Sequence, residues 1–176
     1  MKFLKVLATI VVLFAVVLFG GGLMLSPKFH VERSTVVNAP ADKVYALVAD
    51  PHRWKDWTVW NRRDPSMQIE YFGAASGASS GWAWKSATEG DGKMTLTAVE
   101  PLARVAYDLY FPDFESTSTG DLRFTAEGGG TRVTWGMDGD MGGNPLMHWM
   151  ALLMDRMVGK DFEAGLANLK ALAEAP

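Results

Sequence analysis

The sequence predicts an α+β protein in which an antiparallel sheet covers one long C-terminal helix. Between residues 67 and 138, apolar and polar residues alternate with period two in short runs separated by turn-like segments, which is typical of an antiparallel meander. Residues 145–174 then have the apolar periodicity of a helix. With 176 residues and no internal repeat, the chain suits one domain of about 150 residues after an N-terminal segment.

Residues 1–27 differ in composition from the rest of the chain. Lys2 and Lys5 are followed by 20 uncharged residues, Val6 to Leu25. As a helix these residues span about 30 Å, the thickness of a bilayer core. We therefore predict one N-terminal transmembrane helix that anchors the chain through residues 6–25. A cleaved signal peptide is the alternative, and the apolar residues that resume at 23–25 favour the anchor.

The charges predict where the domain of residues 28–176 resides. Lys2 and Lys5 favour a cytoplasmic N-terminus, so this single-pass chain would export its domain, to the periplasmic side of the inner membrane in a Gram-negative cell. After signal cleavage the same domain would be secreted or periplasmic. Residues 26–176 contain 15 basic and 20 acidic residues, a net charge of −5. This charge argues against a nucleic-acid partner and against adsorption to anionic head groups.

The elements of the domain follow from local patterns. Residues 29–38 alternate as a strand, and Pro40 and Asp42 then suit the first turn of a helix. Residues 51–65, bounded by prolines, form a short helical or irregular stretch. Further strands are predicted at 67–72, 81–87, 93–100, 104–111, 120–127 and 131–138. The sheet therefore has about six or seven strands.

The C-terminal helix has a good start signal and an unusual face. Asn144 is a suitable N-cap, and Pro145 suits the first helical position. Four methionines fall within about 80° of one face of this helix, namely Met147, Met150, Met154 and Met157. Methionine is a flexible apolar side chain, so this face favours the wall of a permissive cavity over ordinary core.

A sheet twisted around one helix leaves space where the two diverge, and this space is the candidate ligand-binding cavity. We expect its wall to combine inward positions of the strands with the methionine face. The predicted residues are Trp82, Trp84, Met94, Leu96, Tyr107, Leu109, Phe124, Trp135, Met137, Met147, Met150, Met154 and Met157. Tyr107 and the indole N–H groups would supply directional contacts, although aromatic residues at this spacing also fit an ordinary core.

Few ionisable residues are candidates for chemistry. Arg33 shares the inward face of its strand, so it is a candidate polar contact for a ligand and needs a carboxylate from elsewhere in the chain. A strand-end bulge that turns Arg33 to solvent is the alternative. Asp108 and Asp138 fall on the outward face of their strands, which argues against a catalytic role in the cavity. His52 and His148 are expected at the solvated surface, and we expect no catalytic residue, metal site or cofactor.

In this order, these segments resemble the START-like superfamily, also called SRPBCC or birch-pollen-allergen-like. Within it they are most similar to the bacterial polyketide cyclase/dehydrase and lipid-transport-like group. The matching segments span residues 31–170 and are "VERSTVVNAPADKVYALVAD", "WKDWTVW" with "RDPSM" after it, "SGWAWKS", "GKMTLT", "FESTSTGDLRF", "GGGTRVTW" and "KDFEAGLANLK". The resemblance implies the helix-grip fold with a hydrophobic cavity between sheet and C-terminal helix. The group often carries an N-terminal membrane segment.

These observations lead to an expected function with two alternatives. We expect a membrane-anchored, exported domain that binds a hydrophobic small molecule or lipid without catalysis. The first alternative is a cyclase or dehydratase-type enzyme, which needs an ionisable group inside the same cavity. The second is a structural or partner-binding envelope module whose core is filled by its own side chains. The sequence names no protein partner.

Overall fold

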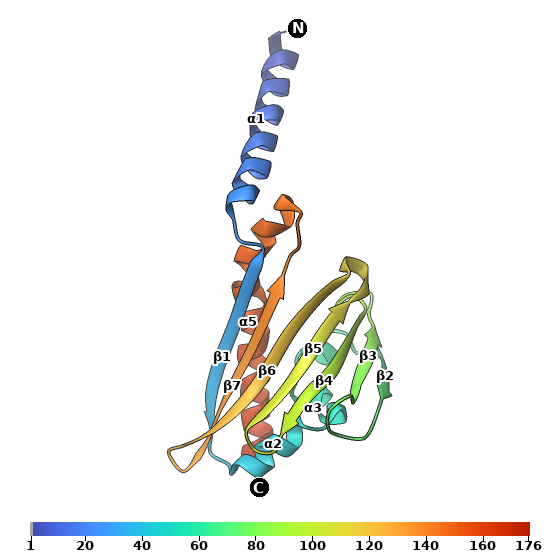
Figure 1. Cartoon of the computed structure of the whole chain (residues 1–176), viewed down its shortest axis with the longest axis vertical. Coiled ribbons are helices and arrows are strands. Elements are labelled where there is room, and N and C mark those ends of the chain that lie inside the picture. Colours follow the sequence, from blue (N-terminus) through green and yellow to red (C-terminus); the bar gives the residue numbers. More distant parts are fainter. Residues whose placement is uncertain (1) are drawn as a thin grey trace.

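The computed structural model describes residues 2–176 and confirms the predicted α+β architecture (Figure 1). A seven-stranded antiparallel sheet covers the long helix α5, Pro145–Glu174, in the helix-grip arrangement. The strand order across the sheet is β1-β7-β6-β5-β4-β3-β2. The strands are Lys28–Val37 (β1), Gln68–Phe72 (β2), Gly81–Lys85 (β3), Gly92–Glu100 (β4), Arg104–Phe111 (β5), Ser116–Glu127 (β6) and Gly130–Asp140 (β7).

The remaining helices are short, apart from the N-terminal one. Helix α1, Lys2–Met24, projects from one end of the sheet (Figure 1). It is long and apolar enough to cross a membrane, a test that a signal sequence also passes. The short elements between β1 and β2, and between β5 and β6, are Ala41–Val48 (α2), Pro51–Arg53 (η1), Trp54–Trp57 (α3), Trp60–Arg63 (α4) and Pro112–Phe114 (η2).

Strand β6 begins earlier than its side chains predict. The sequence pattern starts this strand at Gly120, whereas the structure starts it at Ser116. Ser116 pairs with Phe111 of β5, and from Ser118 onward the strand also pairs with β7. The extension is held by backbone hydrogen bonds, which do not depend on side-chain polarity. Its polar sequence therefore resembles a loop although it is central strand.

Arg33 ties β1 to α5. Its Nε donates to Glu163 Oε1 at 2.6 Å, and its Nη1 donates to Asp155 Oδ1 at 2.7 Å. Both carboxylates raise the pKa of Arg33 further above its usual range, and Arg33 lowers the pKa of Asp155. The guanidinium occupies the space that a Cβ of Gly159 would need, so the glycine permits this approach. Strand β1 pairs with β7 in continuous register, so no bulge turns Arg33 outward.

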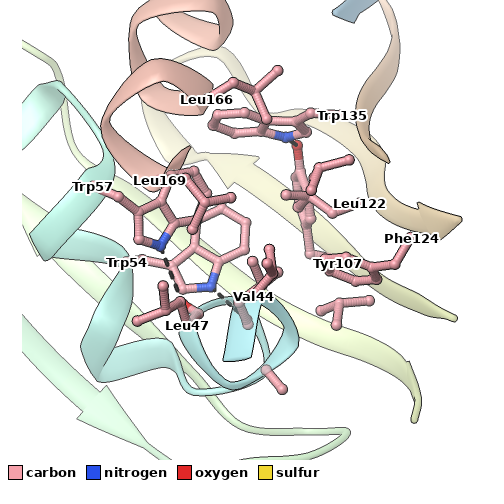
Figure 2. Packing of buried hydrophobic residues seen from close by; sticks show 14 of the residues in the cluster. Val44, Leu47, Trp54, Trp57, Tyr107, Leu122, Phe124, Trp135, Leu166 and Leu169 are labelled. Atoms are coloured by element: carbon pink, nitrogen blue, oxygen red, sulfur yellow. Dashed lines mark hydrogen bonds between the residues drawn. The ribbon is translucent and has the colours of Figure 1, made fainter. Parts of the chain in front are cut away.

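The core lies between the sheet, α2, α3 and the second half of α5 (Figure 2). Trp135 stacks on Phe162 with ring centroids 3.9 Å apart. The indole N–H groups of Trp54 and Trp57 donate to the carbonyls of Val48 and Leu47, at 2.8 and 3.1 Å. The residues after Val158 on α5 thus form ordinary core through Leu166, Leu169 and their neighbours, as their periodicity predicts.

The prediction that His148 lies at the solvated surface is wrong. Its side chain is buried, with a residue exposure of 8%, and its two ring nitrogens face backbone oxygens. Nδ1 lies 2.8 Å from the carbonyl oxygen of Gly22, and Nε2 lies 2.9 Å from that of Gly142. The prediction failed because α1 packs on the first turns of α5, which a wheel of α5 alone cannot include. His52, by contrast, is exposed as predicted.

Candidate ligand cavity

A cavity of about 640 Å³ lies between the sheet and the first half of α5. Helix α5 packs closely on β1, while the sheet curves away from the helix toward β2 (Figure 1). The hollow forms where the two layers diverge. Its wall is largely apolar, which suits a ligand bound by hydrophobic contact.

The sheet side of the cavity consists of alternating inward positions on adjacent strands. The predicted residues that line it are Trp82, Trp84, Met94, Tyr107, Leu109 and Met137. Strand pairing brings them together, because Trp82 faces Met94 across β3–β4 and Met94 faces Leu109 across β4–β5. Cross-strand neighbours of this kind share one face of a sheet. The parity of the strands therefore predicted these positions.

The helix side contains three of the four predicted methionines. Met147, Met150 and Met154 line the cavity, and Val158 and Phe162 continue the same wall. Met157 does not line it and is 53% exposed. Met157 lies at the edge of the methionine arc, beyond the part of α5 that faces the sheet.

Three other predicted wall residues lie in the closed core. Leu96, Phe124 and Trp135 are buried and do not line the cavity. They share the inward face with the wall residues but sit further along their strands, where the second half of α5 fills the space. Arg33 also lies outside the cavity wall, since its guanidinium binds the carboxylates of α5 near β1.

Sequence reasoning missed several wall residues. Ile69 and Tyr71 alternate on β2, and this parity was available in the sequence. Trp60 continues the series of tryptophans spaced three residues apart, but nothing local showed that this helical stretch faces the cavity. Further missed side chains include Trp54 of α3 and residues of strand ends and connections, namely Phe29, Met67, Phe111, Phe114 and Met141. Long-range contacts alone place these residues together.

Most indole N–H groups of the wall are already engaged. Trp60 donates to Asp161 at 3.0 Å, Trp84 to the carbonyl of Gly90 at 2.9 Å, and Trp54, which also lines the cavity, to the carbonyl of Val48 at 2.8 Å. Burial raises the pKa of Tyr107, so its phenol stays neutral at physiological pH. Directional contacts to a ligand are therefore few, and shape and apolar area must provide most of the affinity.

The ionisable residues around the cavity are predominantly acidic. Lys55 is the one cation of its lining within residues 2–176. The carboxylates are those of Glu89, Asp91, Asp113, Glu115, Asp140 and Asp161. A cavity lined in this way carries a negative potential. Asp138, which has outward parity, is exposed and instead pairs with His30 Nδ1 at 2.8 Å.

Among the carboxylates of α5, Asp161 is the one that lines the cavity. Arg63 donates to both of its oxygens at 2.7 and 2.9 Å, and Trp60 adds a third bond. The same guanidinium binds Glu89 of the β3–β4 connection at 2.7 Å. These bonds raise the pKa of Arg63 above its usual range. The network links one edge of the sheet to α5 through charge-assisted hydrogen bonds.

A curved sheet that holds an apolar cavity against a C-terminal helix defines a class of α+β ligand-binding fold. A family model described as polyketide cyclase / dehydrase and lipid transport matches residues 28–174. The chain belongs to this family. No curated protein sequence matches the chain significantly.

Solved structures share the fold at low sequence identity. A protein from Thermobifida fusca has a TM-score of 0.63 and 21% identity, over 82% of this chain and 92% of that one. The di-domain ARO/CYC StfQ from the steffimycin biosynthetic pathway has a TM-score of 0.63 and 16% identity, over 85% of this chain. The match covers 51% of StfQ. Ara h 8.0201 has a TM-score of 0.58 and 12% identity, over 83% of this chain and 97% of that one. At these identities the likeness shows the fold alone.

Proposed function

We propose that the chain is a membrane-anchored domain that binds a hydrophobic small molecule or lipid in this cavity without catalysis. The apolar hollow of about 640 Å³ is the observation that carries the proposal. Its volume lies within the range of roughly 300–1,000 Å³ typical of small-molecule sites. Ten buried methylenes of an alkyl ligand would contribute about 8 kcal/mol before the cost of association. Micromolar binding is therefore attainable with few hydrogen bonds.

The proposal divides the chain into an anchor, residues 1–27, and a ligand-binding domain, residues 28–176. Lys2 and Lys5 favour a cytoplasmic N-terminus and an exported domain. Contacts between α1 and α5 favour a retained anchor over a cleaved signal peptide. Cleavage would remove the Gly22 carbonyl that lies 2.8 Å from His148 Nδ1 and the Leu18 carbonyl that accepts from Trp149 Nε1 at 3.0 Å.

A cyclase or dehydratase-type enzyme is the second candidate, and Asp161 is the observation that favours it. This carboxylate lines the cavity, as an acid or base acting on a bound substrate would. Its oxygens, however, already accept hydrogen bonds from Arg63 and Trp60. Because both oxygens are already engaged within the protein, carriage or sensing of the ligand is favoured over catalysis by this residue. The open volume of the cavity argues against the alternative of a structural or partner-binding module whose core is filled by its own side chains.

Binding of a neutral apolar probe tests the proposal. The full chain, purified in mild detergent, is titrated with N-phenyl-1-naphthylamine, and native mass spectrometry records any co-purified molecule. We expect saturable fluorescence enhancement in the micromolar range. Met154→Trp should narrow the cavity and weaken the enhancement, whereas Met157→Trp on the exposed side of the same helix should not. Equal binding by both variants, or no binding by the native chain, would contradict the proposal.

A further inference from the structure

Helix α1, the β5–β6 connection and the β7–α5 connection lie at the same end of the sheet (Figure 1). Lys28 at the start of β1 pairs with Asp140 at the end of β7, so the β7–α5 connection lies where α1 joins the sheet. Antiparallel pairing puts the β5–β6 connection at this end as well. The cavity lining includes residues 113–116 of the β5–β6 connection and residues 140–144 of the β7–α5 connection. The cavity thus reaches the surface between these two connections.

Helix α1 is docked on α5 by specific contacts. Trp149 packs against Gly21 and donates its indole N–H to the carbonyl of Leu18 at 3.0 Å. The carbonyl oxygen of Gly22 lies 2.8 Å from Nδ1 of His148. The backbone of Pro145 occupies the space that a Cβ of Gly22 would need. The joint therefore depends on these two glycines. Gly20, one residue earlier, has open space at the equivalent position.

The docking fixes the depth of α5 relative to a bilayer. The uncharged run of α1 begins after Lys5 and spans one bilayer core of about 30 Å. Gly21 and Gly22 lie within the last third of that run, whereas Leu18 is its 13th residue. Trp149 packs on Gly21 and Pro145 packs on Gly22, so the start of α5 lies beside the end of the run that borders the interface, where tryptophan is enriched in membrane proteins. The first turn of α5 must start at the membrane surface.

The residues exposed around the mouth are apolar enough to meet that surface. Phe114, at the tip of the β5–β6 connection, is 71% exposed, and Leu146, in the first turn of α5, is 40% exposed. Phe114 also lines the cavity, as does Met147, which follows Leu146 in the sequence. An apolar surface thus continues from the outer rim into the interior. On the edge of the sheet, the Arg63–Asp161–Glu89 network already links the wall to α5.

We propose that the mouth opens onto the leaflet in which α1 ends, so that an apolar ligand passes directly between membrane and cavity. This inference rests on the anchor of the proposed function. Phe114 and Leu146 contact the lipid surface, and α1 holds the mouth there through its joint with α5. Direct transfer avoids exposing apolar ligand surface to water, which is unfavourable in proportion to its area. Asp113, Glu115 and Asp140 surround the mouth, so the anchor and the apolar rim, rather than attraction to anionic lipid, keep it at the membrane.

The absence of cysteine makes site-specific labelling straightforward. Single cysteines replacing Phe114, Leu146 or Leu102 carry an environment-sensitive fluorophore, and the full chain is placed in phosphatidylcholine nanodiscs. Leu102 is a matched control, because it is 47% exposed but belongs to the β4–β5 turn at the opposite end of the sheet. We expect blue-shifted emission and protection from aqueous iodide at Phe114 and Leu146 only. Equal quenching at all three positions would overturn the inference.

Glycine variants test whether the α1–α5 joint is the cause. Gly22→Val should disrupt docking and return the Leu146 label to water, whereas Gly20→Val should leave it protected. We also expect Gly22→Val to slow uptake of N-phenyl-1-naphthylamine from phosphatidylcholine nanodiscs several-fold without changing its equilibrium affinity. Unchanged uptake in Gly22→Val would count against the inference. Probe binding in detergent reports separately on the proposed function, so the mouth inference and the cavity function can fail independently.

Discussion

Replacing Met154 by alanine distinguishes a cavity wall from a packed core on the same helix. Met154 lies on the partly buried wall, and Leu169 lies four turns further along, fully buried. Leu169→Ala removes a side chain enclosed on all sides, so it should cost about 2–5 kcal/mol, which includes the cavity that remains. Met154→Ala adds to a space that already exists, so no new void is enclosed.

The expected cost of Met154→Ala follows from its burial. A fully buried methionine contributes about 1.5–3 kcal/mol through burial, and about half of that, about 1 kcal/mol, applies to a side chain open on one side. For a domain of this size, about 1 kcal/mol lowers Tm by about 2–4 °C. Leu169→Ala should lower Tm at least twice as far. Thermal unfolding followed by circular dichroism in one detergent measures both variants.

Ligand affinity should respond in the opposite order. Met154→Ala removes three methylene-sized groups, so a ligand packed against the whole side chain would lose about 2 kcal/mol, or about 30-fold in Kd. Leu169→Ala should leave Kd for N-phenyl-1-naphthylamine nearly unchanged at temperatures where the variant remains folded. A Tm loss for Met154→Ala equal to that of Leu169→Ala, with unchanged probe binding, would refute the assignment of Met154 to a ligand-accessible wall.

Three further predictions concern charge and close packing. Gly159→Ala should lower the free energy of unfolding because the new Cβ displaces the guanidinium of Arg33. In an Arg33→Ala background the same substitution should raise the free energy of unfolding by up to about 1 kcal/mol, because alanine has the higher helix propensity. A double-mutant cycle measured by thermal unfolding detects this change of sign. Because Arg33 lowers the folded-state pKa of Asp155, this pair stabilises the protein above the unfolded-state pKa, and the stability difference from Asp155→Asn should disappear as pH falls below about 4. Because the cavity lining is acidic, an alkyl amine or alcohol should displace the neutral probe at a lower concentration than the carboxylic acid of equal chain length. The double substitution Asp113→Asn and Glu115→Gln should reduce this difference in displacing concentration, which a competition titration measures.

Strand parity predicted which residues face inward but not how far each lies from the helix. Met94 and Leu96 share one face of β4, yet Met94 lines the cavity and Leu96 lies in closed core. Met137 and Trp135 are related in the same way on β7. In both strands the wall residue is nearer the α1 end. Period-two alternation carries no information on this axial position, because it is set by where α5 diverges from the sheet.

Long-range partners account for the other differences between prediction and structure. The inward parity of Arg33 required a carboxylate, but only the fold shows that Asp155 and Glu163 of α5 supply it. His148 was assigned to the surface because the wheel of α5 placed it opposite the methionines. Docking of α1 turns that polar side into an interface, and His148 accommodates two carbonyl oxygens there. Local patterns predict elements well because neighbouring residues determine them, whereas such contacts join segments far apart in sequence.

The division of α5 explains why methionine occurs where it does. The second half of the helix packs Phe162, Leu166 and Leu169 against fixed aromatic neighbours, and side chains with few rotamers suit such a site. The first half faces open space through Met147, Met150 and Met154. A leucine there would present a fixed surface, while methionine can adjust to ligands of different shape at a cost in rotamer entropy. Because each methionine loses rotamer entropy when a ligand fixes it, this wall suits weak binding of a range of apolar ligands better than tight recognition of one.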